Sequence, residues 1–234
     1  MRVIREMSVR VIEVNKSIYA EQEKLADGTR QLLKQKGTFL VNVMASPGAG
    51  KTSVLLRTAR MLQDRYRIGV MEADIDATVD AEKMAAAGIR SIQVHTGGEC
   101  AMTAQMTRQA LDGILQENGD ETRKEEKFDI LFLENVGNLV CPAEEDVGAS
   151  LNIEILSVPE GDDKPLKYPL MFQVTQAVLI NKTDTKEYFP FDDAAVVRRI
   201  HALNPEAEIF FVSAKTGEGF EAWAEWLEQK VRKV

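Results

Sequence analysis

The sequence has no long apolar run that could cross a membrane. No stretch of it approaches the roughly 20 consecutive apolar residues that a bilayer-spanning helix needs. Charged residues interrupt the apolar ones in the first 24 residues, MRVIREMSVRVIEVNKSIYAEQEK, and this stretch lacks a small-residue cleavage site. It therefore does not fit the pattern of a signal peptide. We therefore expect a cytoplasmic protein with no membrane partner.

Basic residues are also too few for a nucleic-acid-binding surface. The chain has 29 Lys and Arg against 37 Asp and Glu, which gives a net charge of −8. Because nucleic-acid recognition needs a basic face, this balance argues against such a partner. The length of 234 residues and a hydrophobic content of 44% suffice for one α/β domain with a full core.

Cysteine is scarce, with only Cys100 and Cys141 in the chain. The two thiols could form a disulfide, but cytosolic proteins usually keep their cysteines reduced. The residues alone leave two interpretations open, namely buried core thiols and ligands of a metal.

What the sequence does contain is a regular alternation of apolar strands and amphipathic helices. We expect strands over 38–45, 67–73, 91–95, 128–135, 152–158, 177–184 and 207–215, and helices over 13–36, 54–65, 84–88, 100–116, 194–204 and 218–233. This alternation predicts a doubly wound α/β fold, with a mostly parallel sheet covered by helices on both faces. Residues 1–37 would form an amphipathic helical segment packed on a single P-loop domain, 38–234.

The stretch MASPGAGKTS lies where the first strand passes into a helix. Glycines there let backbone N–H groups face phosphates, and the helix N-terminus adds partial positive charge. Lys51 can reach the β- and γ-phosphates, and the Thr52 hydroxyl can ligate Mg²⁺. Ala45 stands where the pattern G-x-x-x-x-G-K-[ST] has its first glycine. The predicted phosphate-binding residues are Gly48, Ala49, Gly50, Lys51, Thr52 and Ser53.

A second motif, 178-VLINKTD-184, ends a later strand, at the sheet edge where open α/β sheets bind ligands. The carboxylate of Asp184 can accept hydrogen bonds from guanine N1–H and N2–H₂, which adenine does not offer. The Lys182 stem would lie along the base, and Asn181 would tie the two nucleotide loops together. The later run FFVSAKTGEG supplies the companion loop, in which the Ala214 N–H can donate to guanine O6, flanked by Ser213 and Lys215.

Acidic residues follow two strands and are candidates for Mg²⁺. Asp74 and Asp76 follow the second strand, and Glu134 ends the most apolar one, in the place of a Walker B carboxylate. A solvated acidic loop is the alternative for Asp74 and Asp76. The Gly137 N–H could sense the γ-phosphate. Lys51, Thr52, Asp74 and Glu134 are the expected catalytic residues.

Together these motifs resemble those of the HypB family, GTPases that help insert nickel into [NiFe]-hydrogenases. The resemblance extends over 134-ENVGNLVCPAEEDVG-148, 155-ILSVPEGDDKPLKYPLMF-172 and 203-LNPEAEIFFVSAKTGEGFEAWAEWL-227. It implies slow GTP hydrolysis, a GTP-dependent homodimer and a metal site between two subunits. It also implies two partners, a small nickel chaperone of the HypA type and a nickel-enzyme client subunit.

The resemblance further implies that Cys100 and Cys141 bind Ni²⁺ or Zn²⁺. The family's histidine after the first cysteine is replaced by Ala101, and Leu170 stands where a family variant carries another histidine. His95 and Glu99 are alternative ligands close to Cys100, although His95 also fits a hydrogen-bonded histidine at a strand end. Two cysteines from each of two subunits would instead supply four thiolates, which suit tetrahedral Zn²⁺ or planar Ni²⁺.

Three hypotheses of function follow. The first is a GTPase metallochaperone in which GTP orders the loops after Asp74 and Glu134, and so acts on Cys141 in the same segment. The second is an accessory GTPase for another nickel enzyme, such as urease or carbon monoxide dehydrogenase. The third is a nucleotide-dependent assembly scaffold without metal transfer. No side chain is an obvious water-positioning group, so we expect slow hydrolysis under each.

Overall fold

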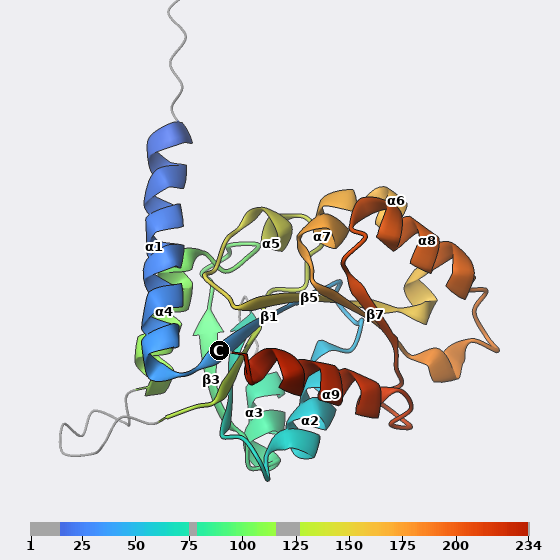
Figure 1. Cartoon of the computed structure of the whole chain (residues 1–234), viewed down its shortest axis with the longest axis horizontal. Coiled ribbons are helices and arrows are strands. Elements are labelled where there is room, and N and C mark those ends of the chain that lie inside the picture. The colour runs from blue at the N-terminus through green and yellow to red at the C-terminus, as the bar shows by residue number, and fades with distance from the viewer. Residues whose placement is uncertain (1–14, 75–78, 116–126, 234) are drawn as a thin grey trace, which may run out of the picture.

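Seven parallel strands form one sheet at the centre of the molecule (Figure 1). The computed structural model describes residues 15–74, 79–115 and 127–233. The strand order is β3-β2-β4-β1-β5-β6-β7. The strands are β1 (Phe39–Ala45), β2 (Ile68–Asp74), β3 (Arg90–His95), β4 (Ile130–Glu134), β5 (Leu151–Ser157), β6 (Ala177–Asn181) and β7 (Glu208–Phe211). The predicted doubly wound α/β fold is confirmed, and each of the seven expected strands is present.

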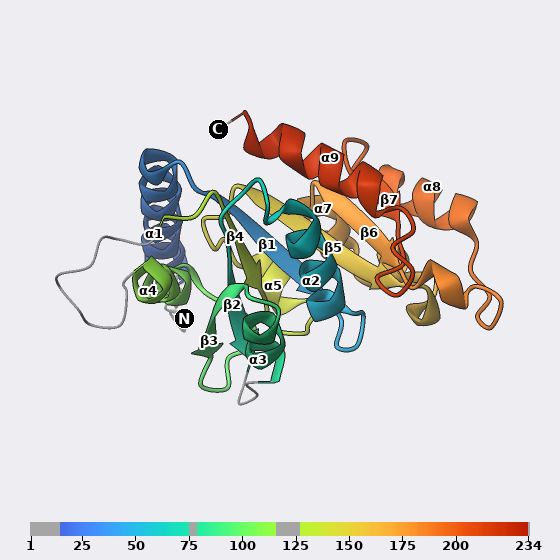
Figure 2. The same ribbon diagram turned by 90° about the horizontal axis from the view of Figure 1, so that it is seen from below.

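Helices cover both faces of this sheet. They are α1 (Asn15–Lys36), α2 (Lys51–Leu62), α3 (Val79–Ala86), α4 (Ala104–Leu115), α5 (Cys141–Glu144), α6 (Lys164–Lys167), α7 (Pro169–Val174), α8 (Asp193–Leu203) and α9 (Phe220–Val231), with 3₁₀ turns η1 (Val158–Glu160) and η2 (Thr183–Thr185). Helices α2, α3 and α9 lie on one face, towards the viewer in Figure 2. Helices α1, α4, α5, α7 and α8 pack on the other.

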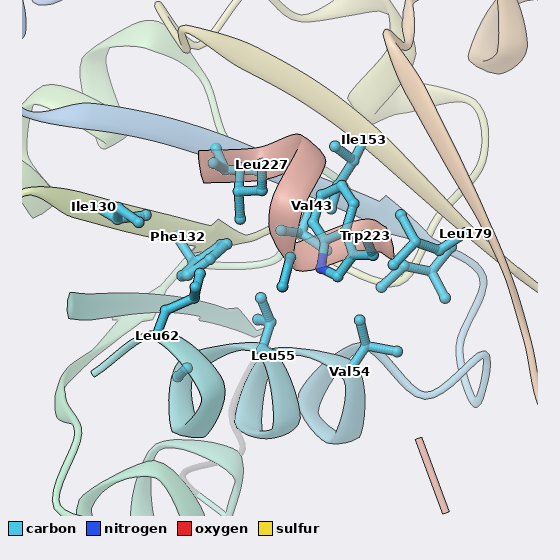
Figure 3. Close-up of a cluster of buried hydrophobic side chains, with 14 of the residues drawn as sticks. Val43, Val54, Leu55, Leu62, Ile130, Phe132, Ile153, Leu179, Trp223 and Leu227 are labelled. Carbon is cyan, nitrogen blue, oxygen red and sulfur yellow. The ribbon is translucent and has the colours of Figure 1, made fainter. Parts of the chain in front are cut away.

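The largest core cluster lies between the sheet and the pair α2 and α9 (Figure 3). Leu55 of α2 and Leu227 of α9 are buried against Val43 of β1, and Trp223 is 1% exposed. The Trp223 indole N–H donates to the Thr58 hydroxyl at 3.0 Å, which satisfies the one polar group of this large side chain. This packing fixes α2, whose first residues form the phosphate loop's helical end.

Some predicted boundaries differ from the structure. Helix α4 begins at Ala104 rather than at residue 100, because Thr103 caps it by accepting from the Met106 N–H at 3.3 Å. The short helices α5, α6 and α7 were not predicted, since four to six residues are too few to show helical periodicity. Each carries proline in its first turn, which is a start signal that the sequence does contain.

Within the described residues, no helix combines the length and apolar character that crossing a membrane requires.

Candidate functional site

The turn from β1 to α2 forms a loop suited to phosphate. Gly50 precedes α2 with φ 99°, a conformation that favours glycine, and a Cβ there would lie 2.6 Å from the Asn181 amide nitrogen. The N–H groups at the start of the 12-residue α2 have no helical partner and face the loop. Ala45 is the last residue of β1, in extended conformation, so this position does not need the glycine of the usual pattern.

On one side of this loop lies a pocket of about 330 Å³. It is lined by Pro47, Gly48, Lys51, Glu72, Ala73, Asp74, Gln93, Glu134, Asn135, Val136 and Gly137. The Thr52 hydroxyl donates to the Glu134 carboxylate at 3.2 Å. The structure therefore brings together the four predicted catalytic residues, with the oxygen ligands that Mg²⁺ prefers. Asp74 ends β2 with an exposed side chain. Asp76 lies outside the described residues.

On the other side of the loop a second pocket, of about 370 Å³, contains residues that the sequence predicts to bind guanine. It is lined by Gly50, Ser53, Asn181, Lys182, Asp184, Thr185, Ala214 and Lys215. One oxygen of the Asp184 carboxylate accepts from the buried Ser213 hydroxyl at 2.6 Å, which fixes the orientation of the carboxylate. The other lies 3.8 Å from the Lys215 ammonium. The Ala214 N–H donates to the Asn181 side-chain oxygen at 3.1 Å.

Asn181 and Lys182 connect this base pocket to the phosphate loop. The Asn181 amide, which is 1% exposed, donates to the Ala49 carbonyl at 2.9 Å, and the Lys182 ammonium donates to the Gly48 carbonyl at 2.6 Å. Lys182 adopts φ 61°, an unusual backbone conformation for a residue other than glycine, and it directly follows Asn181, the last residue of β6. The predicted role of Asn181 as a tie between the loops fits these contacts.

The segment after β4 folds back onto the phosphate loop. A Cβ at Gly137 would lie 3.1–3.2 Å from Pro47, so the two backbones are in close approach. The next residue, Asn138, forms an isolated antiparallel bridge with Ala45. The phosphate loop and the segment that precedes Cys141 are therefore in direct backbone contact.

Cys100 and Cys141 lie side by side and form a disulfide, with their Cα atoms 6.0 Å apart. The expectation of reduced thiols is thus wrong for this structure, because the fold brings two loops within disulfide-bonding distance. The core-thiol interpretation is also wrong, since Cys100 is exposed and Cys141 half-buried. Cys100 lies four residues before α4, so it does not open that helix, whereas Cys141 opens α5.

Two buried or half-buried asparagines hold this pair of loops together. The Asn135 side-chain oxygen accepts from the Met102 N–H at 3.0 Å, which fixes the loop of Cys100 against β4. The Asn135 amide in turn donates to Asn42 of β1 at 3.1 Å. The Asn138 amide donates to the Cys141 sulfur at 3.4 Å. Sequence reasoning missed both roles, although two asparagines in the polar run ENVGN were a visible signal.

The other candidate metal ligands do not join the cysteines. Within the described parts of the chain, no three His, Cys, Asp or Glu side chains form a group that could hold a metal. His95 is an exposed residue at the end of β3, and Glu99 is exposed in the following loop. The Ala101 side chain is only 3% exposed, so this position does not face solvent beside the thiols. The described residues of one subunit therefore supply two adjacent sulfur donors without a third ligand grouped with them.

The surroundings of the thiols are acidic. Burial raises the pKa of Glu145 above its ordinary value, and the nearby charges of Glu144 and Glu99 raise it further. Three carboxyl groups near Cys100 and Cys141 create a negative potential, which favours an approaching cation.

Comparison with known proteins agrees with this geometry. The family model of the CobW/HypB/UreG nucleotide-binding domain matches residues 39–211. The hydrogenase maturation factor HypB of Rhizobium leguminosarum bv. viciae is 40% identical to the chain over 219 residues, which cover 94% of this chain and 70% of the relative. The chain belongs to the HypB family. The hydrogenase/urease maturation factor HypB of Helicobacter hepaticus is also 40% identical over 219 residues, which cover 94% of this chain and 88% of that relative.

A solved HypB structure has the same fold. The crystal structure of HypB from Helicobacter pylori in complex with nickel superimposes with a TM-score of 0.82 at 37% identity, covering 91% of this chain and 96% of that one. The chain is thus a P-loop NTPase of the HypB type. Two pocket residues of this HypB chain, Glu72 and Gln93, were not predicted. A carboxylate inside β2, which is apolar up to that residue, was the available signal for Glu72.

Proposed function

We propose that this HypB-family chain is a GTP-binding, slowly GTP-hydrolysing metallochaperone that helps insert nickel into [NiFe]-hydrogenase. It works as a GTP-dependent homodimer with a metal site made by cysteines of both subunits. The observation that carries the proposal is the Ala45–Asn138 bridge, because it joins the phosphate loop to the segment of Cys141. A nucleotide-dependent shift at the loop then reaches a metal ligand within three residues of Asn138.

The nucleotide would bind across the two pockets on either side of the phosphate loop. Asp184 reads the guanine N1–H and N2–H₂ edge, with its orientation fixed by the Ser213 hydroxyl. Lys51 neutralises the β- and γ-phosphates, and Mg²⁺ would be held by Thr52, Asp74 and Glu134. Mg²⁺ supplies charge neutralisation between the phosphates when it is bound. The donor set of one hydroxyl and two carboxylates fits this ion.

Slow hydrolysis follows from what lines the phosphate pocket. Gln93 is the uncharged amide facing it from β3, but its Nε2 group already donates to the Glu72 carbonyl at 3.0 Å. The amide is therefore held by the sheet rather than left to orient an attacking water. Lys51 would then stabilise the transition state, and we expect no water-positioning side chain among the described residues of the pocket.

The nickel ion would be cargo held between subunits. A single subunit offers two adjacent sulfur atoms, and a second subunit brings two more, which completes the four thiolates that suit planar Ni²⁺ or tetrahedral Zn²⁺. Thiolates, not a disulfide, are the ligands, so uptake of the ion requires the pair to be reduced first. A small nickel chaperone of the HypA type would deliver the ion, and the client subunit would receive it.

Nucleotide binding and turnover test the enzymatic half of this proposal. Equilibrium binding of GDP and ADP to the purified chain should give a preference for GDP, and Asp184→Ala should abolish it. GTP hydrolysis with Mg²⁺ should be measurable but slow, and Lys51→Ala should remove it. Binding without hydrolysis would favour the assembly scaffold over the GTPase. Equal affinity for GDP and ADP would contradict the proposal itself.

A second client is favoured by one finding. The relative from Helicobacter hepaticus carries the name hydrogenase/urease maturation factor, and it is as similar to this chain as the relative named for hydrogenase alone. A urease-type client is therefore the alternative. A maturation assay in cells that lack their own HypB decides between them, with hydrogenase and urease activity measured in the same strains. Restored urease activity without restored hydrogenase activity would favour the alternative.

A further inference from the structure

Arg57 of α2 reaches from the phosphate-binding helix to the loop that borders the base pocket. Its Nε donates to the Ala214 carbonyl at 2.9 Å, and its Nη2 donates to the Lys215 carbonyl at 3.2 Å. The guanidinium also lies over the buried Phe220 ring, with its Cζ 5.7 Å from the ring centroid. A half-buried arginine thus satisfies two consecutive backbone carbonyls of one loop.

The fit of the guanidinium extends to a glycine in the same loop. Gly217 has φ 95°, and a Cβ there would lie 2.7 Å from Arg57 Nη1. The loop is closed by backbone hydrogen bonds between Gly217 N–H and the Ser213 carbonyl at 2.8 Å, and between Ser213 N–H and the Glu218 carbonyl at 3.0 Å. Arg57 therefore occupies the space that a side chain at Gly217 would take, and it links this turn to α2.

We propose that Arg57 is a positioning residue for guanine recognition. It holds the 213–215 loop so that the Ala214 N–H, which in this structure donates to the Asn181 side-chain oxygen at 3.1 Å, can also meet guanine O6. This inference rests on the proposed guanine site. Asp184 reads the other edge of the base and is oriented by Ser213, so it is anchored at a different point of the loop. Arg57 binds the two carbonyls beyond Ser213, so its removal releases the carbonyl side of Ala214 and Lys215 while the Ala214 N–H keeps its bond to Asn181.

The proposal predicts that Arg57 affects recognition of O6 more than recognition of the 2-amino group. Three diphosphates distinguish these contacts: GDP has both groups, inosine diphosphate lacks the 2-amino group, and 2-aminopurine riboside diphosphate lacks O6 together with N1–H. The effect of Arg57 is therefore read from the ratio of variant to wild-type affinity for each nucleotide. Arg57→Ala should lower the affinities for GDP and for inosine diphosphate by the same factor, about fivefold to tenfold, because one hydrogen bond to O6 is lost. Affinity for the 2-aminopurine nucleotide should stay as in the wild type.

Matched variants keep this test decisive. Arg60→Ala removes an exposed arginine of the same helix and should change none of the three affinities. Arg57→Lys retains the charge but offers a compact ammonium that cannot span both carbonyls, so it should give an intermediate loss for GDP. This variant also serves as the test if Arg57→Ala fails to fold, as judged by its melting curve.

The outcomes separate this inference from the proposed function. If the wild type does not prefer GDP to ADP, the guanine site itself is wrong. If the wild type prefers GDP but Arg57→Ala lowers the affinity for all three nucleotides equally, Arg57 only supports the fold. If the variant lowers none of the three affinities, the 213–215 loop keeps its position without Arg57. Either of the last two results overturns the positioning role of Arg57 and leaves the GTPase proposal standing.

Discussion

The side-chain amide of Asn138 donates a hydrogen bond to the Cys141 sulfur at 3.4 Å. The backbone of the same asparagine bridges to Ala45, the last residue before the phosphate loop. Its side-chain oxygen accepts from the Val140 N–H at 2.8 Å, which fixes the turn between the two residues. One asparagine thus contacts both the nucleotide loop and a proposed metal ligand.

We predict that Asn138→Ala lowers nickel affinity while sparing nucleotide binding. Removing a residue that orients a metal ligand through a hydrogen bond typically lowers the metal affinity by about tenfold or more. The backbone bridge to Ala45 does not need the Asn138 side chain. GDP affinity should therefore stay within about twofold of the wild type, a smaller change than the loss of one hydrogen bond would cause. Nickel titration and GDP titration of the reduced variant measure both quantities. Unchanged nickel affinity would show that Asn138 does not orient Cys141.

Asp184→Asn should change the base preference from guanine to xanthine. The amide would present a donor where the carboxylate accepts, and xanthine carries an oxygen where guanine carries its 2-amino group. The affinity for GDP should fall on the order of 100-fold, because two charge-assisted hydrogen bonds are affected. The Asn side-chain oxygen can still accept from Ser213, so the loop should remain in place. Competition between GDP and xanthosine diphosphate measures the change, and a retained preference for GDP would refute the assigned role.

The buried carboxyl group of Glu154 should make the free energy of unfolding depend on pH. It is 0% exposed on β5, and neither of its oxygens has a hydrogen-bond partner among the described residues. Burial raises its pKa well above the ordinary value, the charge of Glu160 raises it further, and Lys51 and Lys164 lower it. The folded state therefore keeps a proton that the unfolded chain loses above about pH 4.3. Its contribution to stability is complete below that pH and falls as pH rises towards the folded pKa.

Glu154→Met removes this ionisation at similar volume. The variant should gain stability relative to the wild type as pH rises from 5 to 8, by up to about 1.4 kcal/mol per pH unit. Chemical denaturation at several pH values measures the difference. Glu208→Met, which replaces an exposed glutamate on β7, is the control and should show no such trend. Parallel pH curves for Glu154→Met and the wild type would mean that Glu154 is ionised in the fold.

Gly148 joins the N-terminal helix to the domain, and its replacement tests that contact. It has φ 75°, and an added Cβ would lie 2.6 Å from the Ala26 carbonyl oxygen of α1. Gly148→Ala should lower the free energy of unfolding by about 1–3 kcal/mol, through backbone strain and displacement of α1. Gly28→Ala is the matched control, because nothing lies within 4 Å of the added atom and the helix should gain about 0.5–1 kcal/mol. Equal melting temperatures for both variants would show that α1 is loosely attached.

The sequence was sufficient to predict the sheet and the nucleotide loops for a physical reason. Buried strands and the Gly-Lys-Thr and Asn-Lys-x-Asp motifs are local patterns, and their consequences depend on few distant residues. By contrast, the pairing of Cys100 with Cys141 and the bonds of Asn135 and Asn138 depend on how loops meet in three dimensions. The helices α5 to α7 were missed because their length hides their periodicity.

We propose that nucleotide state and metal binding are coupled through the segment 134–141. The most direct test is a Ni²⁺ titration of the reduced chain with GDP and with a non-hydrolysable GTP analogue, with the mass in solution measured in parallel. Zn²⁺, Cys100→Ala and Cys141→Ala serve as comparisons. We predict a dimer with a distinct nickel affinity in the GTP-analogue state, and loss of the bound ion in both cysteine variants. The same nickel affinity in both nucleotide states, or unchanged stoichiometry in both variants, would contradict the account.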